Sequence, residues 1–131
     1  MKEPAPAWPL VAVGAIPGAL LRWGLERGGV ALKGPVMGLW IGDLVANLLA
    51  CAVLGGVLAL PSGRRGWRVA GGAGFCGSLS TFSSWIGQLH AAWQLGQAAN
   101  AAGLLTVSLL GGLAVLALSR RLLHGWFRRR R

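Results

Sequence analysis

The longest uncharged stretch of the chain limits its fold more than any other feature. Residues 69–119 carry no Asp, Glu, Lys or Arg over 51 positions. A membrane-spanning helix needs about 20 apolar residues, so this run is long enough for two spans and a short link. Residues 4–21 are also uncharged, and residues 34–63 carry Asp43 as their single charge. The sequence therefore predicts an all-α membrane protein with four transmembrane helices.

The bounds of the four helices follow from the ends of these apolar runs. We expect the spans at about residues 10–25, 36–60, 69–93 and 101–123, followed by a basic tail at 124–131. Residues 28–35 are expected to form the first loop, and Pro17 is expected to kink the first helix. Together these segments predict a single transmembrane domain over residues 1–131.

The basic residues predict the orientation of the chain. With the N-terminus in the cytoplasm, ten Lys and Arg side chains lie inside and three lie outside, namely Arg22, Arg27 and Lys33. The positive-inside rule then predicts a multi-pass protein of the plasma (inner) membrane with both termini cytoplasmic. The lipid bilayer is its expected surrounding. Nucleic-acid binding is not expected, because the charges flank apolar segments instead of forming one basic face.

Residues 74–85 are the most polar part of the third apolar segment. Five hydroxyl side chains fall within seven residues there, close to two glycines. We expect the third helix to be broken near its middle, at about residues 77–81, which would free backbone carbonyl groups. Free carbonyls without a nearby carboxylate suit a monovalent cation.

The aromatic and polar side chains near this break suit a small, hard anion. Phe82 and Trp85 are three residues apart and share a helix face, and aromatic rings have electropositive edges. Hydroxyl and amide donors from the same depth would replace part of the anion's hydration shell: Asn47, Ser83 and Ser108. The alternatives are lipid or core contact for the rings and interhelical hydrogen bonds for the polar groups.

Two charged residues lie within or beside the apolar segments. Asp43 shares a helix face with Asn47, four residues later. Arg22 either extends to the lipid headgroups or caps carbonyl groups and attracts anions at a vestibule. The sequence has no nucleophile and base set, phosphate-binding loop or metal-ligand cluster, and Cys51 and Cys76 read as small apolar residues. No enzyme activity and no catalytic residues are therefore expected.

Motifs in all four segments resemble those of the Fluc (CrcB) family of fluoride channels. The family pattern G-F-C-G-G-x-T-T-F-S-T-F is similar to residues 74–85, which read G-F-C-G-S-L-S-T-F-S-S-W. The patterns G-x-x-x-R and G-T-L-x-x-N are similar to residues 18–22 and 42–47. The fourth segment has Leu104, Ser108 and Gly112 where the family often has Tyr, Ser and Gly.

The resemblance implies an antiparallel dimer with two pores that export fluoride and lower cytoplasmic fluoride. It also implies one structural, non-transported sodium ion at the dimer centre, bound by the backbone carbonyls of Gly77 and Ser80. The implied pore positions and the implied vestibule residue are Asn47, Phe82, Trp85 and Ser108, with Arg22 at the vestibule.

Asp43 and the charge asymmetry make this chain distinct from the family pattern. Asp43 stands where the family has Thr, and it is a candidate modulator. An ionised carboxylate would repel fluoride, whereas burial favours the protonated form. The ten-to-three asymmetry favours one direction of insertion, so we expect a dimer with a related, oppositely oriented subunit, otherwise a homodimer. Two alternatives remain: a small four-helix multidrug or cation exporter, and a non-conducting partner subunit of a heterodimeric fluoride channel.

Overall fold

The computed structural model of the protein describes residues 7–61 and 63–129. Within these residues the chain is helical and contains no strand. The two ends of the predicted domain lie outside the described residues. So do three of the basic residues counted for the predicted charge asymmetry: Lys2, Arg130 and Arg131. The elements are α1 (Trp8–Lys33), α2 (Pro35–Ala59), α3 (Arg65–Arg68), the π-helix η1 (Val69–Cys76), α4 (Gly77–Leu79), α5 (Ser83–Gln94) and α6 (Ala98–Arg129).

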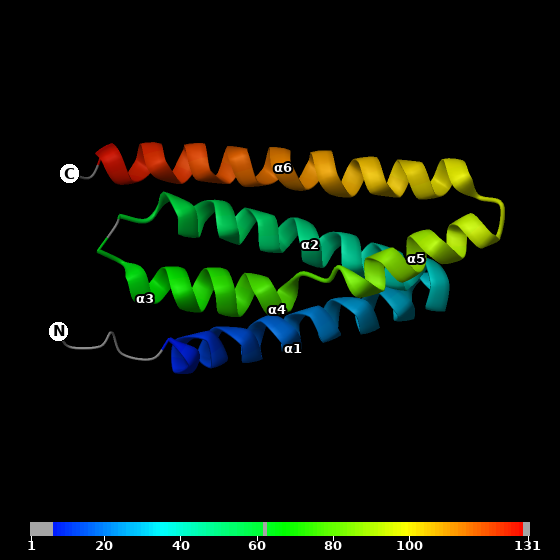
Figure 1. Ribbon diagram of the computed structural model, residues 1–131, viewed down its shortest axis with the longest axis horizontal. Coiled ribbons are helices and arrows are strands. Elements are labelled where there is room, and N and C mark those ends of the chain that lie inside the picture. The colour runs from blue at the N-terminus through cyan, green and yellow to red at the C-terminus, as the bar shows by residue number, and fades with distance from the viewer. Residues whose placement is uncertain (1–6, 62, 130–131) are drawn as a thin grey trace.

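Three of the helices are long and apolar enough to cross a membrane. They are α1, α2 and α6, with 26, 25 and 32 residues. The residues of the third predicted span lie instead in η1, α4 and α5, which follow one another along the bundle (Figure 1). The chain is therefore an all-helical, multi-pass membrane protein.

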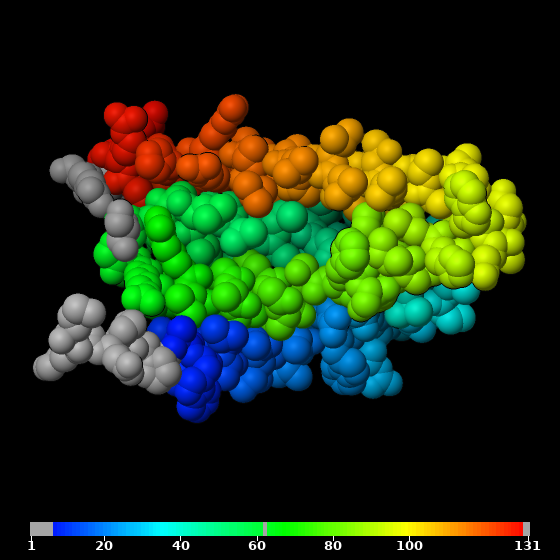
Figure 2. Space-filling model, in the orientation of Figure 1, coloured from blue at the N-terminus to red at the C-terminus, as the bar shows by residue number. Residues whose placement is uncertain are grey.

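The helices lie side by side and alternate in direction. The start of α1, the turn between α2 and α3, and the end of α6 lie at one end of the bundle (Figure 1). The link between α5 and α6 lies at the other end. α2 contacts both α1 and α6, and η1 packs mainly on α1. Figure 2 shows α5 exposed on the face between α6 and α1.

Glycines bring α1 and η1 into backbone contact. A Cβ atom added at Gly14 would overlap the carbonyl of Ala70 and lie 2.9 Å from the amide nitrogen of Phe75. One added at Gly74 would lie 3.0 Å from the Cα of Gly14. Small residues allow such close approach between membrane helices. The wider π-helical turn of η1 falls in this contact, and such turns are frequent near functional sites.

Small side chains also form the core next to this contact. The fully or nearly fully buried cluster consists of Ala46, Ala50, Cys76 and Leu79. Cys76 is a free thiol, and so is the half-buried Cys51. The interpretation of the cysteines as small apolar residues is confirmed. The core therefore lies where α2 meets η1 and α4, the two elements that precede the break in the third predicted span.

The predicted loop at residues 28–35 is wrong. α1 continues as far as Lys33, and the turn is reduced to Gly34, which has a φ of 80°. Glycine adopts this positive φ without a Cβ clash. Pro35 begins α2, at the first helical position, where its missing N–H is not needed. The basic residues mark where the apolar part of the helix ends. Long basic side chains can extend to the membrane surface, however, and do not interrupt the helix itself.

The fourth predicted helix is also longer than its apolar run. α6 begins at Ala98, three residues early, and continues through Arg129. The predicted tail is therefore helical over its described part, and the arginines project from the last turns of α6. The turn before α6 contains Gly96, with a φ of 71°. The predicted helix end at about residue 123 is wrong, because charge marks the end of an apolar run and does not end a helix.

Candidate functional site

The third predicted span is broken, as expected, but at residues 80–82 and not at 77–81. Ser80 has extended backbone angles, with φ −71° and ψ 149°. The side chain of Asn47 on α2 fills the break. Its Oδ1 accepts the backbone N–H of Thr81 at 2.8 Å, and its Nδ2 donates to the Thr81 carbonyl at 3.2 Å. Asn47 thus replaces both backbone hydrogen bonds that the break removes at Thr81.

This arrangement leaves acceptor groups at the break. In a continuous helix the carbonyl of Gly77 would accept the N–H of Thr81, four residues later. Asn47 takes that donor, and the extended Ser80 ends the series of helical bonds. Gly77 and Ser80 are both exposed on the single chain. The break therefore lies at the surface of the single chain.

Asp43 lies beside the break and is fully buried, with 0% of its surface exposed. Its Oδ2 accepts hydrogen bonds from the hydroxyl of Ser84 and from Nε2 of Gln88, the latter at 2.5 Å. Glu26, which pairs with Arg22 at 3.8 Å, is an electrostatic neighbour of this carboxyl group. A buried carboxyl group needs such partners, because an unpaired one is strongly disfavoured.

The cluster around Asp43 still has unused polar atoms. Among the described residues, Oδ1 of Asp43, Oε1 of Gln88 and Oγ1 of Thr81 are buried and have no hydrogen-bond partner. Buried polar atoms normally have one. These three atoms, two of them acceptors only, therefore mark a place where a water, a proton or an ion would be stabilised.

The sequence analysis missed the two hydrogen-bond partners of Asp43, Ser84 and Gln88, and its electrostatic neighbour Glu26. Ser84 and Gln88 are four residues apart, so helical spacing alone indicates that they share one face of α5. Glu26 could not be found in that way, because the predicted first helix ended at residue 25. Only the continuation of α1 brings Glu26 against Gly42, whose added Cβ would lie 2.9 Å from the Glu26 Cα.

Phe82 and Trp85 are in ring contact, with centroids 5.8 Å apart, but their surroundings differ. Trp85 is 6% exposed, and its indole N–H donates to Oγ of Ser108 on α6 at 3.1 Å. Phe82 is 72% exposed. Ser83, between them, is also exposed. The structure thus brings together the predicted aromatic pair and Ser108, and it leaves one ring and one hydroxyl at the surface of the chain.

Arg22 was predicted to serve as a vestibule residue or to extend to the lipid headgroups. It is half-buried on α1 and pairs with Glu26, one turn later on the same helix. Neither sequence interpretation of Arg22 included a carboxylate partner. Glu26 is also an electrostatic neighbour of Asp43, so the Arg22–Glu26 pair lies near the buried acid of α2.

Comparisons with known proteins agree over nearly the whole bundle. The family model described as CrcB-like protein, Camphor Resistance (CrcB), matches residues 9–120. The chain is 38% identical over 117 residues to fluoride-specific ion channel FluC 2 of Prochlorococcus marinus (strain MIT 9313), covering 89% of this chain and 80% of that protein. It is 43% identical over 110 residues to fluoride-specific ion channel FluC 2 of Synechococcus sp. (strain CC9902), covering 83% and 73%.

A relative of similar length comes from Nitrosomonas europaea. Its protein, named fluoride-specific ion channel FluC, is 35% identical over 122 residues, which cover 90% of this chain and 93% of the relative. The matched region includes the break, the Asp43 network and the Trp85 contact with α6. On these matches and on its helical membrane fold, the chain belongs to the CrcB-like family.

Proposed function

We propose that this protein is a fluoride channel that exports fluoride across the plasma membrane and so lowers cytoplasmic fluoride. The observation that carries the proposal is the contact between Phe82, Trp85 and Ser108 beside a helix break that Asn47 holds open. The relatives' printed names, fluoride-specific ion channels, support the same function. No catalytic role is assigned to any residue.

The proposed pathway uses ring edges and hydroxyl groups in place of a fixed positive charge. The exposed Phe82 ring and the Ser83 hydroxyl offer an electropositive edge and a donor to an anion. The N–H of Trp85 is already donated to Ser108, so Trp85 would contribute its ring edge. Weak donors of this kind allow an anion to bind and also to leave, as conduction requires.

A structural sodium ion fits the carbonyl groups of Gly77 and Ser80. Hard cations prefer oxygen ligands, and Asn47 has taken the amide that Gly77 would otherwise bind. One chain offers too few oxygens there, but a two-fold axis would present each carbonyl twice. We therefore propose that sodium joins two chains at their breaks and is not transported.

The same argument favours an antiparallel dimer of four-span chains. The segment from α3 to α5 forms the third of the four spans in this proposal, and both termini lie in the cytoplasm. Because basic residues favour one direction of insertion, the partner is a related subunit of opposite orientation, otherwise a second copy. Fluoride, sodium, this partner and the surrounding lipid bilayer are the proposed partners, and nucleic acid is not among them.

The buried Asp43 favours a second candidate, a small four-helix exporter of drugs or other cations. Such an exporter needs a buried carboxyl group to exchange protons for cations, and Asp43 has an oxygen without a partner among the described residues. A third candidate is a non-conducting partner subunit. Asp43→Thr distinguishes the channel from the exporter, because it should increase fluoride flux in a channel and abolish cation resistance in an exporter.

The direct test is fluoride efflux from liposomes that contain the purified chain, with and without sodium, beside matched chloride efflux. We expect sodium-dependent fluoride efflux and no chloride efflux, either from the chain together with a related subunit or, if the dimer is a homodimer, from the chain alone. Phe82→Ile should reduce efflux, whereas Trp93→Ile should not, although both side chains are similarly exposed, at 72% and 69%. Efflux only after addition of a related subunit would favour the heterodimer. Equal fluoride and chloride efflux would contradict the proposal.

A further inference from the structure

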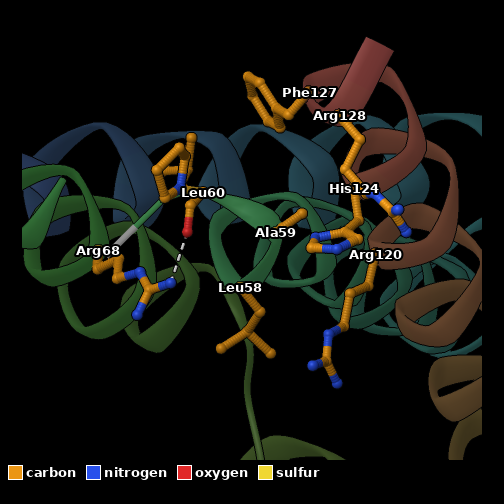
Figure 3. Close-up of a pocket in the computed structure, with 9 residues that line it drawn as sticks. Leu58, Ala59, Leu60, Arg68, Arg120, His124, Phe127 and Arg128 are labelled. Atoms are coloured by element: carbon orange, nitrogen blue, oxygen red, sulfur yellow. Dashed lines mark hydrogen bonds between the residues drawn. The ribbon is translucent and has the colours of Figure 1, made fainter. Parts of the chain in front are cut away.

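A second group of charged side chains lies at the end of the bundle where α1 starts and α6 ends. The end of α2, the helix α3 and the last turns of α6 enclose a cavity of about 320 Å³ (Figure 3). Leu58, Leu60 and Phe127 give it apolar walls. Its basic residues are Arg68, Arg120, His124 and Arg128.

The basic residues come from two separate elements and converge on this cavity. Arg120, His124 and Arg128 follow at intervals of four residues, which puts them on one face of α6. Figure 3 shows them opposite Arg68. Nη2 of Arg68 donates to the carbonyl of Leu60 at 2.5 Å. A guanidinium group has five N–H donors, so this bond fixes Arg68 in position and leaves other donors for a ligand.

No acidic side chain of the described residues balances these charges. The chain has three acidic residues, of which Glu3 lies outside the description. Glu26 pairs with Arg22, and Asp43 bonds to Ser84 and Gln88 near the break. The arginines therefore repel one another across the cavity, and an anion with several oxygens would relieve that repulsion.

An apolar groove continues from this cavity along α2 and α6. It has a volume of about 470 Å³ and shares Leu60 and Phe127 with the cavity. Its other lining residues are Ala52, Val53, Gly56, Val57 and Leu123. The absence of a side chain at Gly56 leaves room in this groove, since a Cβ atom added there would lie 2.8 Å from Cδ1 of Leu123. The basic cavity is thus continuous with an apolar groove that follows a membrane-spanning helix.

We infer that the cavity and the groove together bind one anionic phospholipid. Its phosphate lies among Arg68, Arg120 and Arg128, and one acyl chain follows the groove beside Gly56 and Val57. Free phosphate would leave the groove unused, and a zwitterionic lipid would bring a quaternary amine next to the arginines. Basic pockets between helices at the end of a bundle suit anionic headgroups. This inference is independent of fluoride conduction.

The test uses the full chain in a neutral detergent. Its thermal stability and lipid binding are measured with phosphatidylglycerol, with phosphatidylcholine and with inorganic phosphate. A ligand that binds the native state raises the midpoint of unfolding, so phosphatidylglycerol should raise it, and the other two should not. If phosphatidylcholine gives the same shift, the headgroup site is wrong. If inorganic phosphate does, the acyl-chain groove is wrong.

Two matched double variants distinguish the cavity from general surface charge. Arg120→Gln with Arg128→Gln removes two cavity arginines. Arg64→Gln with Arg65→Gln removes the same charge at the same end, from exposed residues outside the cavity. The first double variant should bind phosphatidylglycerol about tenfold or more weakly than the second, because each charge-assisted bond is worth about that factor. Equal losses in both double variants would overturn the inference.

Discussion

The two parts of the interrupted span contact their neighbours in different ways. Before the break, η1 meets α1 backbone to backbone, through Gly14 and Gly74. After the break, α5 meets α2 and α6 through side-chain hydrogen bonds, from Ser84 and Gln88 to Asp43 and from Trp85 to Ser108. The first part tolerates no added atoms, whereas the second depends on particular polar groups. Substitutions should therefore fail for opposite reasons on the two sides.

The largest effect is expected where backbones touch. Gly14→Leu would force a side chain into the Ala70 carbonyl, and such overpacking costs about 3 kcal/mol or more of stability. Gly24→Leu, on the same helix, is the control, because a Cβ at Gly24 meets nothing within 4 Å. Thermal unfolding and size-exclusion profiles in detergent measure both. Similar stability of the two variants would show that the α1–η1 contact is looser than described.

The next effect is expected at the junction of the two parts. Asn47→Ala removes both bonds to the Thr81 backbone, and leaving buried groups unsatisfied costs about 3 kcal/mol. Hydrogen exchange of the amides at residues 80–82 should accelerate, and fluoride efflux should fall. Asn100→Ala is the matched control, since Asn100 is exposed and bonds only to Gln97 in the described structure. Unchanged exchange at residues 80–82 in Asn47→Ala would contradict this role of Asn47.

Sequence patterns predicted the first part of the span poorly and the second part well. The contact between Gly14 and Gly74 was not predicted, because a pattern of small residues does not say which helices meet. The π-helical turn of η1 has no sequence signal of its own, because it depends on the α1 backbone against which it packs. The break was predicted, and its start was placed three residues early, because glycine at residue 77 remained helical.

The polar site illustrates which information a single sequence lacks. Asn47, Phe82, Trp85 and Ser108 were found from their residue types and depth, and the structure brings them near one break. Their partners were not predicted. Asn47 was expected to face an anion, yet both of its amide atoms bind Thr81. Charged residues give the approximate position of a helix end but not its last residue. The first helix was predicted to end at about residue 25, so the proximity of Glu26 to Asp43 was missed.

A moderate effect is expected where α5 bonds to α2. Gln88→Leu leaves Asp43 with the Ser84 hydroxyl as its remaining donor among the described residues, and the loss of a bond to a buried carboxyl group costs about 2 kcal/mol. Gln94→Leu, at the exposed end of α5, is the control. Thermal unfolding of the two variants measures the difference. If Gln88→Leu is as stable as Gln94→Leu, the bond from Gln88 to Asp43 does not contribute to stability.

The smallest effect is expected where α5 bonds to α6, and it separates a structural role of Trp85 from a conducting one. Trp85→Phe keeps an aromatic ring and removes the N–H that Ser108 accepts, which costs about 1 kcal/mol. Ser108→Ala removes the same bond from the other side. In a double-mutant cycle the two losses should be non-additive, because both variants break one interaction.

Fluoride efflux gives the second readout of these variants. Trp85→Phe should conduct nearly as well as the unmodified chain, since the ring edge remains, whereas Trp85→Leu should lose conduction because no ring edge is left. Additive stability losses in the cycle would mean that the indole N–H and the Ser108 hydroxyl act separately. Equal conduction by the Phe and Leu variants would remove Trp85 from the pathway and leave Phe82 as its aromatic surface.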